Sequence, residues 1–233
     1  MTSSPLLFHG ATFDLVGQRP LLAPALAAEI ERVEARLGWQ LPASVREWYS
    51  IVGIDEFREE FSTPNFQVAL ARLGVDDDDD ELLAERPELV RFMDENQGVG
   101  AWAFDRASGA DPRVFAQSDG GEPWDDSGLR FAEFQFEHTV EYLTYFDWTF
   151  QRRLEGPRPL IERALAVLDA DLRRISFPES PVLVRMLAPT GSAADYLDLR
   201  PIGDGAMARL RVLSEDDARG VALLRQVEAA LAR

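Results

Sequence analysis

The side chains best suited to catalysis are scarce in this sequence. It contains no cysteine, which excludes disulfides, thiolate nucleophiles and cysteine-ligated metal sites. Of its two histidines, His9 lies in an irregular lead-in and His138 follows Glu137 on a predicted long helix. A catalytic pair is one interpretation, but we expect both histidines to be structural or solvated. There is also no spaced histidine pair, serine nucleophile elbow, Walker loop or dinucleotide fingerprint. We therefore predict no catalytic residues, no metal site and no cofactor.

Carboxylates are the abundant ionisable groups. The formal net charge is −17, and residues 156–233 hold 11 acidic and 11 basic residues, so the whole excess lies in residues 1–155. Within that part, residues 55–95 contain 14 acids and four arginines. A field of this sign disfavours nucleic acids and anionic membranes as partners and favours a basic protein surface.

Two acidic segments are candidates for the contact with such a partner. The run at residues 76–81 could instead hold a divalent cation, but it lacks the spaced ligands and turn glycine of a calcium loop. A solvated loop is the simplest interpretation of this run, and a contact loop is the third. In the second segment acids flank Trp124, which suits an aromatic hot spot at an interface. The residues predicted to bind the partner are Asp76, Asp77, Asp78, Asp79, Asp80, Glu81, Asp119, Glu122, Trp124, Asp125 and Asp126.

Two further candidates for chemistry have stronger structural interpretations. Asp94 and Glu95 could form a carboxylate pair for acid/base catalysis. They precede a turn, however, in which Gly98 allows a positive φ, so we assign them to the turn geometry. Trp102 could stack on a ligand, but a large aromatic residue on a strand more often belongs to the core, and we place it there.

Two short amphipathic helices are predicted within residues 29–53. In the first, apolar residues recur at steps of three and four, and the acidic residues, including Glu34, are assigned to the opposite face. Gly38 is expected to cap this helix in a left-handed conformation, and Pro42 suits the first turn of the second helix. The apolar faces consist of Leu26, Ile30, Val33 and Leu37 in the first helix and of Val45, Trp48, Tyr49 and Val52 in the second. Helices this short are unstable alone, so they must pack on a sheet.

A strand-rich segment follows the two helices. Residues 90–95, 99–105 and 113–117 are separated by turn-forming residues, which predicts three successive strands of an antiparallel meander. The other elements predicted for this part are a short strand at residues 11–16, a loop or brief helix at 55–64, a strand at 65–73, a short helix at 82–89, a loop at 118–128 and one long helix at 131–154.

The clearest boundary signal in the chain is the run Gly156-Pro157-Arg158-Pro159. Beyond it we predict an αβββα unit, which could be a small domain or an extension of the first sheet. Its elements are a helix at residues 160–175, strands at 182–187, 196–200 and 208–213, and a last helix with a capping box at Ser214 and Asp217. We expect neither a membrane span nor a secretory signal, since no run reaches 18 apolar residues and the first 18 residues lack a basic and apolar leader.

Three motifs, in this order, resemble the SUKH superfamily, which includes a fungal cell-wall synthesis regulator and many bacterial toxin-immunity proteins. The first is I-x-x-V-E-x-x-L-G-x-x-L-P at residues 30–42, followed by a helix that carries an aromatic residue. The second is a Glu-Asn-Gln-Gly-Val turn before a tryptophan-containing strand. The third is an Asp-Pro pair before an apolar strand. The resemblance covers residues 25–150 and departs from the family at Val52, where a polar residue is common. The motif residues are Gly38, Pro42, Trp48, Glu95, Asn96, Gln97, Gly98, Trp102, Asp111 and Pro112.

The resemblance implies an α+β fold in which two N-terminal helices pack on an antiparallel β-meander sheet and a long helix closes the domain. We expect an irregular lead-in at residues 1–24, the SUKH-like domain at 25–155 and the αβββα extension at 156–233. The implied function is that of a non-enzymatic cytoplasmic immunity protein, which covers the active site of a cognate toxin, for example a nuclease. The alternatives are an intracellular scaffold or regulator of an endogenous partner and, third, a hydrolase with an acidic site. The sequence makes no prediction of the oligomeric state.

Overall fold

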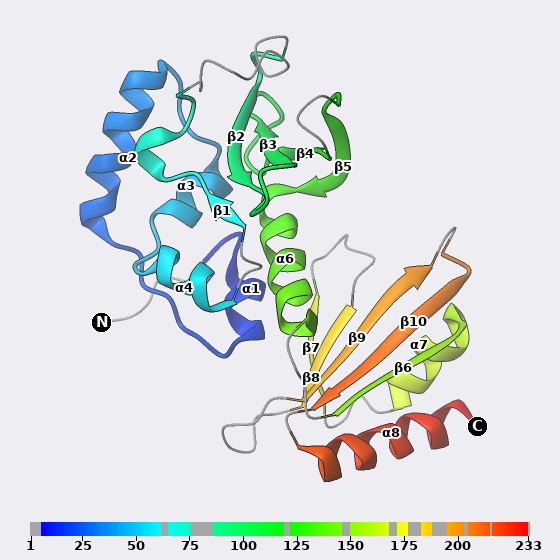
Figure 1. The fold of residues 1–233 in the computed structure, drawn as a ribbon. Helices are drawn as coiled ribbons and strands as arrows, with labels where there is room; N and C mark the ends of the chain where they lie inside the picture. The colour runs from blue at the N-terminus through cyan, green and yellow to red at the C-terminus, as the bar shows by residue number, and fades with distance from the viewer. Residues whose placement is uncertain are drawn as a thin grey trace. The chain divides into compact units, whose positions relative to one another are not determined.

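The computed structural model describes residues 6–61, 65–75, 86–118, 122–145, 150–167, 172–176, 183–187, 195–202, 205–214 and 216–232. The chain divides into two compact units, Met1–Tyr142 and Leu143–Arg233 (Figure 1). Each unit has its own hydrophobic core. The division falls before the predicted boundary at residues 156–159. That prediction is wrong in its local structure, because Gly156 and Pro157 end a strand and Arg158 begins a helix.

The first unit is an antiparallel sheet with helices on one face. Its strands lie in sequence order, and each pairs with the next, so the predicted meander is confirmed. The strands are β1 (Phe66–Gln67), β2 (Leu89–Asp94), β3 (Ala101–Asp105), β4 (Arg113–Gln117) and β5 (Asp125–Arg130). The helices are α1 (Gly10–Leu15), α2 (Pro24–Leu37), α3 (Ala43–Tyr49), α4 (Ile54–Phe61), the 3-10 turn η1 (Leu70–Arg72) and α6 (Phe131–Tyr145).

The two predicted helices are confirmed as α2 and α3. Gly38 follows α2 with φ 73°, the left-handed conformation expected of its cap, and its N–H donates to the carbonyl of Glu34. Ile30 and Val33 of α2 and Trp48 of α3 lie in one hydrophobic core with residues of β2, β3 and α6. Val52 is the exception to the predicted apolar faces: it lies beyond the end of α3 and is exposed.

Several other predictions for this unit need correction. Residues 11–16 form most of a helix, α1, in place of the predicted strand, and residues 55–64 begin with the helix α4, one of the two alternatives. The predicted strand at 65–73 contains only the two-residue β1 and then η1. The loop predicted at 118–128 contains the start of β5. The first half of the short helix predicted at 82–89 lies outside the described residues, and its second half is wrong, because residues 86–89 form a turn and the start of β2. The long helix predicted at 131–154 ends at Tyr145, because Phe150–Pro157 forms a strand.

The second unit is an antiparallel sheet in the order β6-β10-β9-β8-β7. Its elements are β6 (Phe150–Pro157), α7 (Arg158–Val167), β7 (Leu172–Ser176), β8 (Leu183–Leu187), β9 (Asp195–Ile202), β10 (Met207–Ser214) and α8 (Asp217–Leu231). Ile161 of α7 and Val227 of α8 pack with Leu210 of β10, so both helices cover the same face (Figure 1). The αβββα prediction therefore omitted β6, and it extended the first helix to residue 175, whereas α7 ends at Val167 and Leu172–Ser176 forms β7. The last helix and three strands are confirmed. The cap of α8 is Asp216, whose carboxylate accepts the N–H of Arg219, and not the predicted Ser214.

No helix in the described part of the chain is both long and apolar enough to cross a membrane.

The close approach of Gly100 to β4 gives a test of the meander. A Cβ atom at this position would lie 2.8 Å from the carbonyl oxygen of Gln117, which cannot move without disturbing the β3–β4 ladder. We expect Gly100→Ala to lower the free energy of unfolding by about 1–3 kcal/mol in urea denaturation, as overpacking does. Gly10→Ala is the matched control, because nothing lies within 4 Å of its added Cβ. Equal unfolding midpoints for the two variants would contradict the β3–β4 packing.

Candidate functional site

The predicted partner-binding residues that the structure describes, Glu122, Trp124, Asp125 and Asp126, all lie beside or on β5. Asp76 to Asp80, Glu81 and Asp119 lie outside the described residues. Glu122, Asp125 and Asp126 are exposed beside or on β5, and Arg113 pairs with Asp126 at 3.2 Å. Because β5 and β1 are opposite edges of the five-stranded sheet, these acids are separated from the acidic residues that precede β1 by the width of the sheet.

Trp124 does not face solvent, so its predicted role as an exposed aromatic anchor is wrong. Its side chain is only 6% exposed and packs with Leu89, Ala101 and Ala103 in a small second core. The alanines leave room on β3, and the tryptophan fills it, since burial of a large aromatic surface outweighs the acidic character of its neighbours. Trp124 is therefore a structural residue of the sheet.

The helix α4 carries an exposed acidic surface. The sequence predicted only an excess of negative charge over residues 55–95 and did not predict this surface. Asp55, Glu56, Glu59 and Glu60 are all exposed, and none of them forms an ion pair with a described residue. The one basic residue of α4, Arg58, turns inward and is 8% exposed. The four carboxylates therefore face solvent, whereas the one cation of their helix is buried and interacts electrostatically with Asp55. The sequence signal that could have located this surface is the apolar Phe57 within the run of acids. Phe57 is buried, so it marks the inner face of the helix.

Arg58 is buried, which is unusual for a cationic side chain. Its Nη2 donates to the carbonyl oxygen of Asn65 over 3.4 Å, while its buried Nε has no partner among the described residues. Burial lowers the pKa of Arg58 to about 10, and the neighbouring Tyr49 and Asp55 oppose this shift. The side chain therefore stays charged at neutral pH. It offsets part of the negative potential of α4 from the protein interior and not from the surface.

Asn65 connects three elements of the first unit. Its backbone carbonyl accepts from Arg58 on α4, and its side-chain oxygen accepts the N–H of Asn96 at 3.2 Å. Its Nδ2 lies 3.1 Å from Nε2 of His138 on α6. Burial, with a smaller effect of the charge on Arg58, lowers the pKa of His138 to about 4, so this ring is neutral at pH 7 and can accept the amide proton.

The turn between β2 and β3 has a structural explanation for its residues. Gly98 has φ 73°, as predicted, and its N–H donates to the carbonyl of Glu95 at 2.9 Å. The carboxylate of Glu95 accepts the N–H of Gln97 at 2.6 Å, and that of Asp94 pairs with Arg91. Both carboxylates are thus engaged in local geometry, which favours the turn interpretation over an acid/base pair.

Asp111 and Pro112 anchor the start of α6. The Asp111 carboxylate accepts the N–H of Ala132 at 3.0 Å, and the Pro112 carbonyl accepts that of Phe131 at 2.8 Å. Arg130 donates to the Asp111 carbonyl at 2.8 Å. The Asp-Pro motif therefore satisfies amide groups of the first turn of α6, which would otherwise have no partner.

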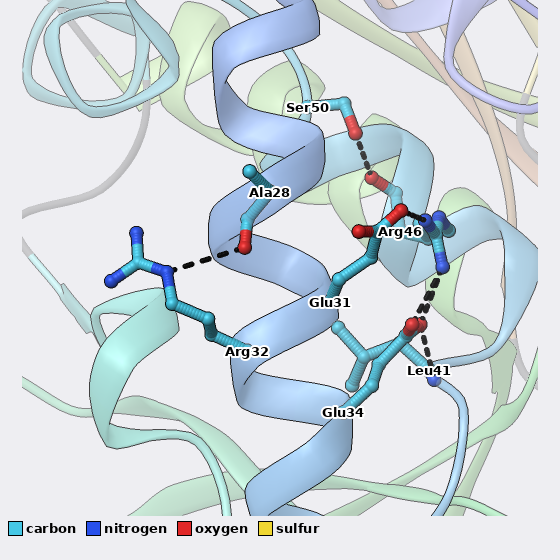
Figure 2. Close-up of polar contacts among 7 residues, drawn as sticks. All are labelled: Ala28, Glu31, Arg32, Glu34, Leu41, Arg46 and Ser50. Carbon is cyan, nitrogen blue, oxygen red and sulfur yellow. Dashed lines mark hydrogen bonds and ion pairs between the residues drawn. The ribbon is translucent and has the colours of Figure 1, made fainter.

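A polar contact between α2 and α3 was also not predicted from the sequence (Figure 2). Glu34 is buried, not exposed as its helical position suggested, and both of its oxygens accept from Nη1 of Arg46 at 2.8 and 2.7 Å. The same carboxylate accepts the N–H of Leu41 at 3.0 Å, and Glu31 lies 4.0 Å from Arg46. Glu34 thus fixes the loop that joins the two helices, which accounts for the glutamate of the first motif.

The two histidines do not form a catalytic pair. His9 is buried between α1 and α3, where Nε2 donates to the carbonyl of Ser44 at 2.9 Å and the ring centroid lies 4.7 Å from that of Trp48. Burial lowers the pKa of His9. His138 has different neighbours, with its ring stacked on Phe134 at 5.1 Å and 5.7 Å from the half-buried Trp102. Each ring is part of the packing of its own region.

Possible metal ligands do not cluster in the described part of the chain. Nowhere in that part of the chain do three histidine, aspartate or glutamate side chains gather as a metal would require. Comparison of the chain with protein-family models, with curated proteins and with solved structures finds no match in any of the three.

Proposed function

We propose that this chain is a non-enzymatic protein-binding module, and that it resembles SUKH immunity proteins in neutralising a basic toxin domain in the bacterial cytoplasm. The observation that carries the proposal is the exposed acidic surface of α4, whose carboxylates form no ion pair with a described residue. Unpaired carboxylates of one sign attract a basic partner over a distance of about 10 Å at 0.1 M salt and speed its association.

The positions of the motif residues support this proposal. Gly38 and Glu34 shape the connection between α2 and α3, the residues from Glu95 to Gly98 shape the β2–β3 turn, and Asp111 begins α6. Each motif thus has a structural role in an α+β unit of helices and an antiparallel meander, and this supports the proposed likeness to SUKH proteins. A nuclease toxin with a basic active site would be the complement of the acidic surface, and occlusion of that site requires no chemistry from this chain.

A pull-down from the native host followed by mass spectrometry is the direct test of the proposal. Recovery of a protein with a basic toxin-like domain, encoded by a neighbouring reading frame, would support the immunity function. Recovery of a housekeeping protein would favour the alternative, a scaffold or regulator of an endogenous partner. A partner that is acidic, or that is retained equally at all salt concentrations, would refute recognition through α4.

The charge of α4 gives a quantitative prediction. We expect Glu59→Gln combined with Glu60→Gln to slow association with the purified partner by about three- to tenfold at low salt, and to do so less at high salt. The measurement is surface plasmon resonance over a range of sodium chloride concentrations.

The matched control removes the same charge at the other edge of the sheet, by Glu122→Gln combined with Asp125→Asn. Association of this control should be close to that of the unmodified protein. If the control slows association and the α4 variant does not, the partner binds at β5 and not at α4.

A further inference from the structure

One aromatic side chain is exposed beside the acidic helix. Phe66 on β1 is 63% exposed, and it is the only aromatic residue among the exposed large hydrophobic side chains of the described residues. An exposed phenylalanine at the edge of a sheet loses the stabilisation of burial, and an apolar patch with a polar rim commonly marks a contact with another protein.

Phe66 is held in a fixed position. The preceding residue, Asn65, bonds to Arg58, Asn96 and His138, and the following residue, Gln67, accepts the indole N–H of Trp48 at 3.0 Å. Phe66 itself pairs with Asp94 of β2. A residue whose flanking backbone is already fixed loses less conformational entropy on binding than a residue in a free loop.

A second exposed apolar side chain lies on the neighbouring turn. Val99 is 52% exposed and belongs to the β2–β3 turn, whose residue Asn96 is bonded to Asn65, directly before Phe66. The strand pairing of Phe66 with Asp94 brings the end of β2, where this turn begins, next to β1. Phe66 and Val99 therefore belong to adjoining parts of the surface.

The acidic helix α4 is tied to the start of β1 by one hydrogen bond. The bond from Arg58 to the carbonyl of Asn65 joins α4 to the residue before Phe66, and Glu59 and Glu60 occupy the two positions that follow Arg58. An apolar centre with an acidic rim is complementary to an apolar side chain flanked by cations. Arginine would suit this rim best, since its planar cation pairs with carboxylates and can stack on an aromatic ring.

We propose that Phe66 and Val99 form the apolar centre, and Glu59 and Glu60 the rim, of a docking surface for a basic polypeptide that presents an apolar side chain between arginines or lysines. This inference rests on the proposed function and names the surface and the partner segment for it. The turn motif at residues 95–99 then has a second role, because it both shapes the meander and supplies Val99 to the contact.

The test uses the partner recovered in the pull-down, produced as a purified protein. Phe66→Ala should accelerate its dissociation at least tenfold and leave the association rate within twofold, because an apolar anchor acts mainly after encounter. Val52→Ala is the matched control, since Val52 is exposed on another part of the same unit and its truncation should change neither rate. The melting temperatures of both variants should equal that of the unmodified protein, which separates loss of the contact from loss of the fold.

The possible results distinguish this inference from the proposed function. Unchanged dissociation of Phe66→Ala, together with slowed association of the α4 double variant, refutes the docking surface but retains the acidic recognition. Unchanged rates in both variants, or a pull-down that recovers no partner sensitive to salt, refutes both. A faster dissociation of Val52→Ala than of Phe66→Ala would place the apolar contact elsewhere.

Discussion

Trp48→Ala is expected to lower the free energy of unfolding of the first unit by about 3–5 kcal/mol, the usual cost of removing a large buried aromatic side chain. The indole is 1% exposed, and its ring lies 6.1 Å from the rings of both Phe13 and Phe57. It therefore joins α1, α3 and α4 in one core. Its Nε1 also donates to Gln67, so the truncation leaves a partly buried amide oxygen without a partner.

Trp48→Phe separates the two contributions. Phenylalanine retains an aromatic ring but cannot donate the hydrogen bond, so we expect it to recover more than half of the loss caused by alanine. Urea denaturation followed by circular dichroism is the measurement. If alanine and phenylalanine were equally destabilising, the hydrogen bond to Gln67 and not the packing would be the main contribution of Trp48.

Acid should destabilise the first unit through His138, by up to about 3 kcal/mol below pH 4. The folded protein lowers the pKa of this ring from 6.5 to about 4, because protonation would place a charge in a buried site beside Arg58. Between these pH values the unfolded chain binds the proton and the folded chain does not. The stabilisation is therefore complete above pH 6.5 and is lost progressively as the pH falls through 6.5 to 4, at about 1.4 kcal/mol per pH unit of pKa difference.

His138→Gln provides the control for the acid effect, because glutamine can accept from Asn65 but does not titrate in this range. Unfolding free energies of this variant should change less between pH 6.5 and 4 than those of the unmodified protein. The remaining slope should include His9, whose pKa is also lowered by burial while the neighbouring Glu47 and Asp111 partly oppose the shift. Identical pH profiles for the two proteins would show that His138 is protonated without cost.

The sequence predicted those elements whose signals are local. The apolar spacing of α2 and α3, the cap at Gly38 and the turns between β2, β3 and β4 all depend on residues close together in the chain, and they are confirmed. β6 was not predicted because its two adjacent arginines and its terminal glycine and proline interrupt the alternation of apolar and polar residues that is typical of a strand. It is an edge strand, where such residues are tolerated.

The errors at the candidate site depend on residues that are distant in the sequence. Acids flank Trp124, but the space that it fills is provided by Ala101 and Ala103 on another strand. Glu34 occupies a polar position of its helix, yet Arg46 on the next helix makes its burial favourable, because Nη1 of Arg46 donates to both carboxylate oxygens. Phe66 was assigned to a regular strand, and its exposure follows from the shortness of β1, which no local pattern indicates.

The strand orders of the two sheets imply different times of assembly during synthesis of the chain. In the first sheet every strand pairs with its predecessor, so each new strand finds its neighbour already made as it leaves the ribosome. In the second sheet β6 is the first strand to emerge, but its only neighbour is β10, the last. β6 must wait with an unpaired edge until Met207–Ser214 have been synthesised, and closing so long a loop slows folding. The first unit, with its acidic surface, can thus complete its folding while the second unit is still unfolded.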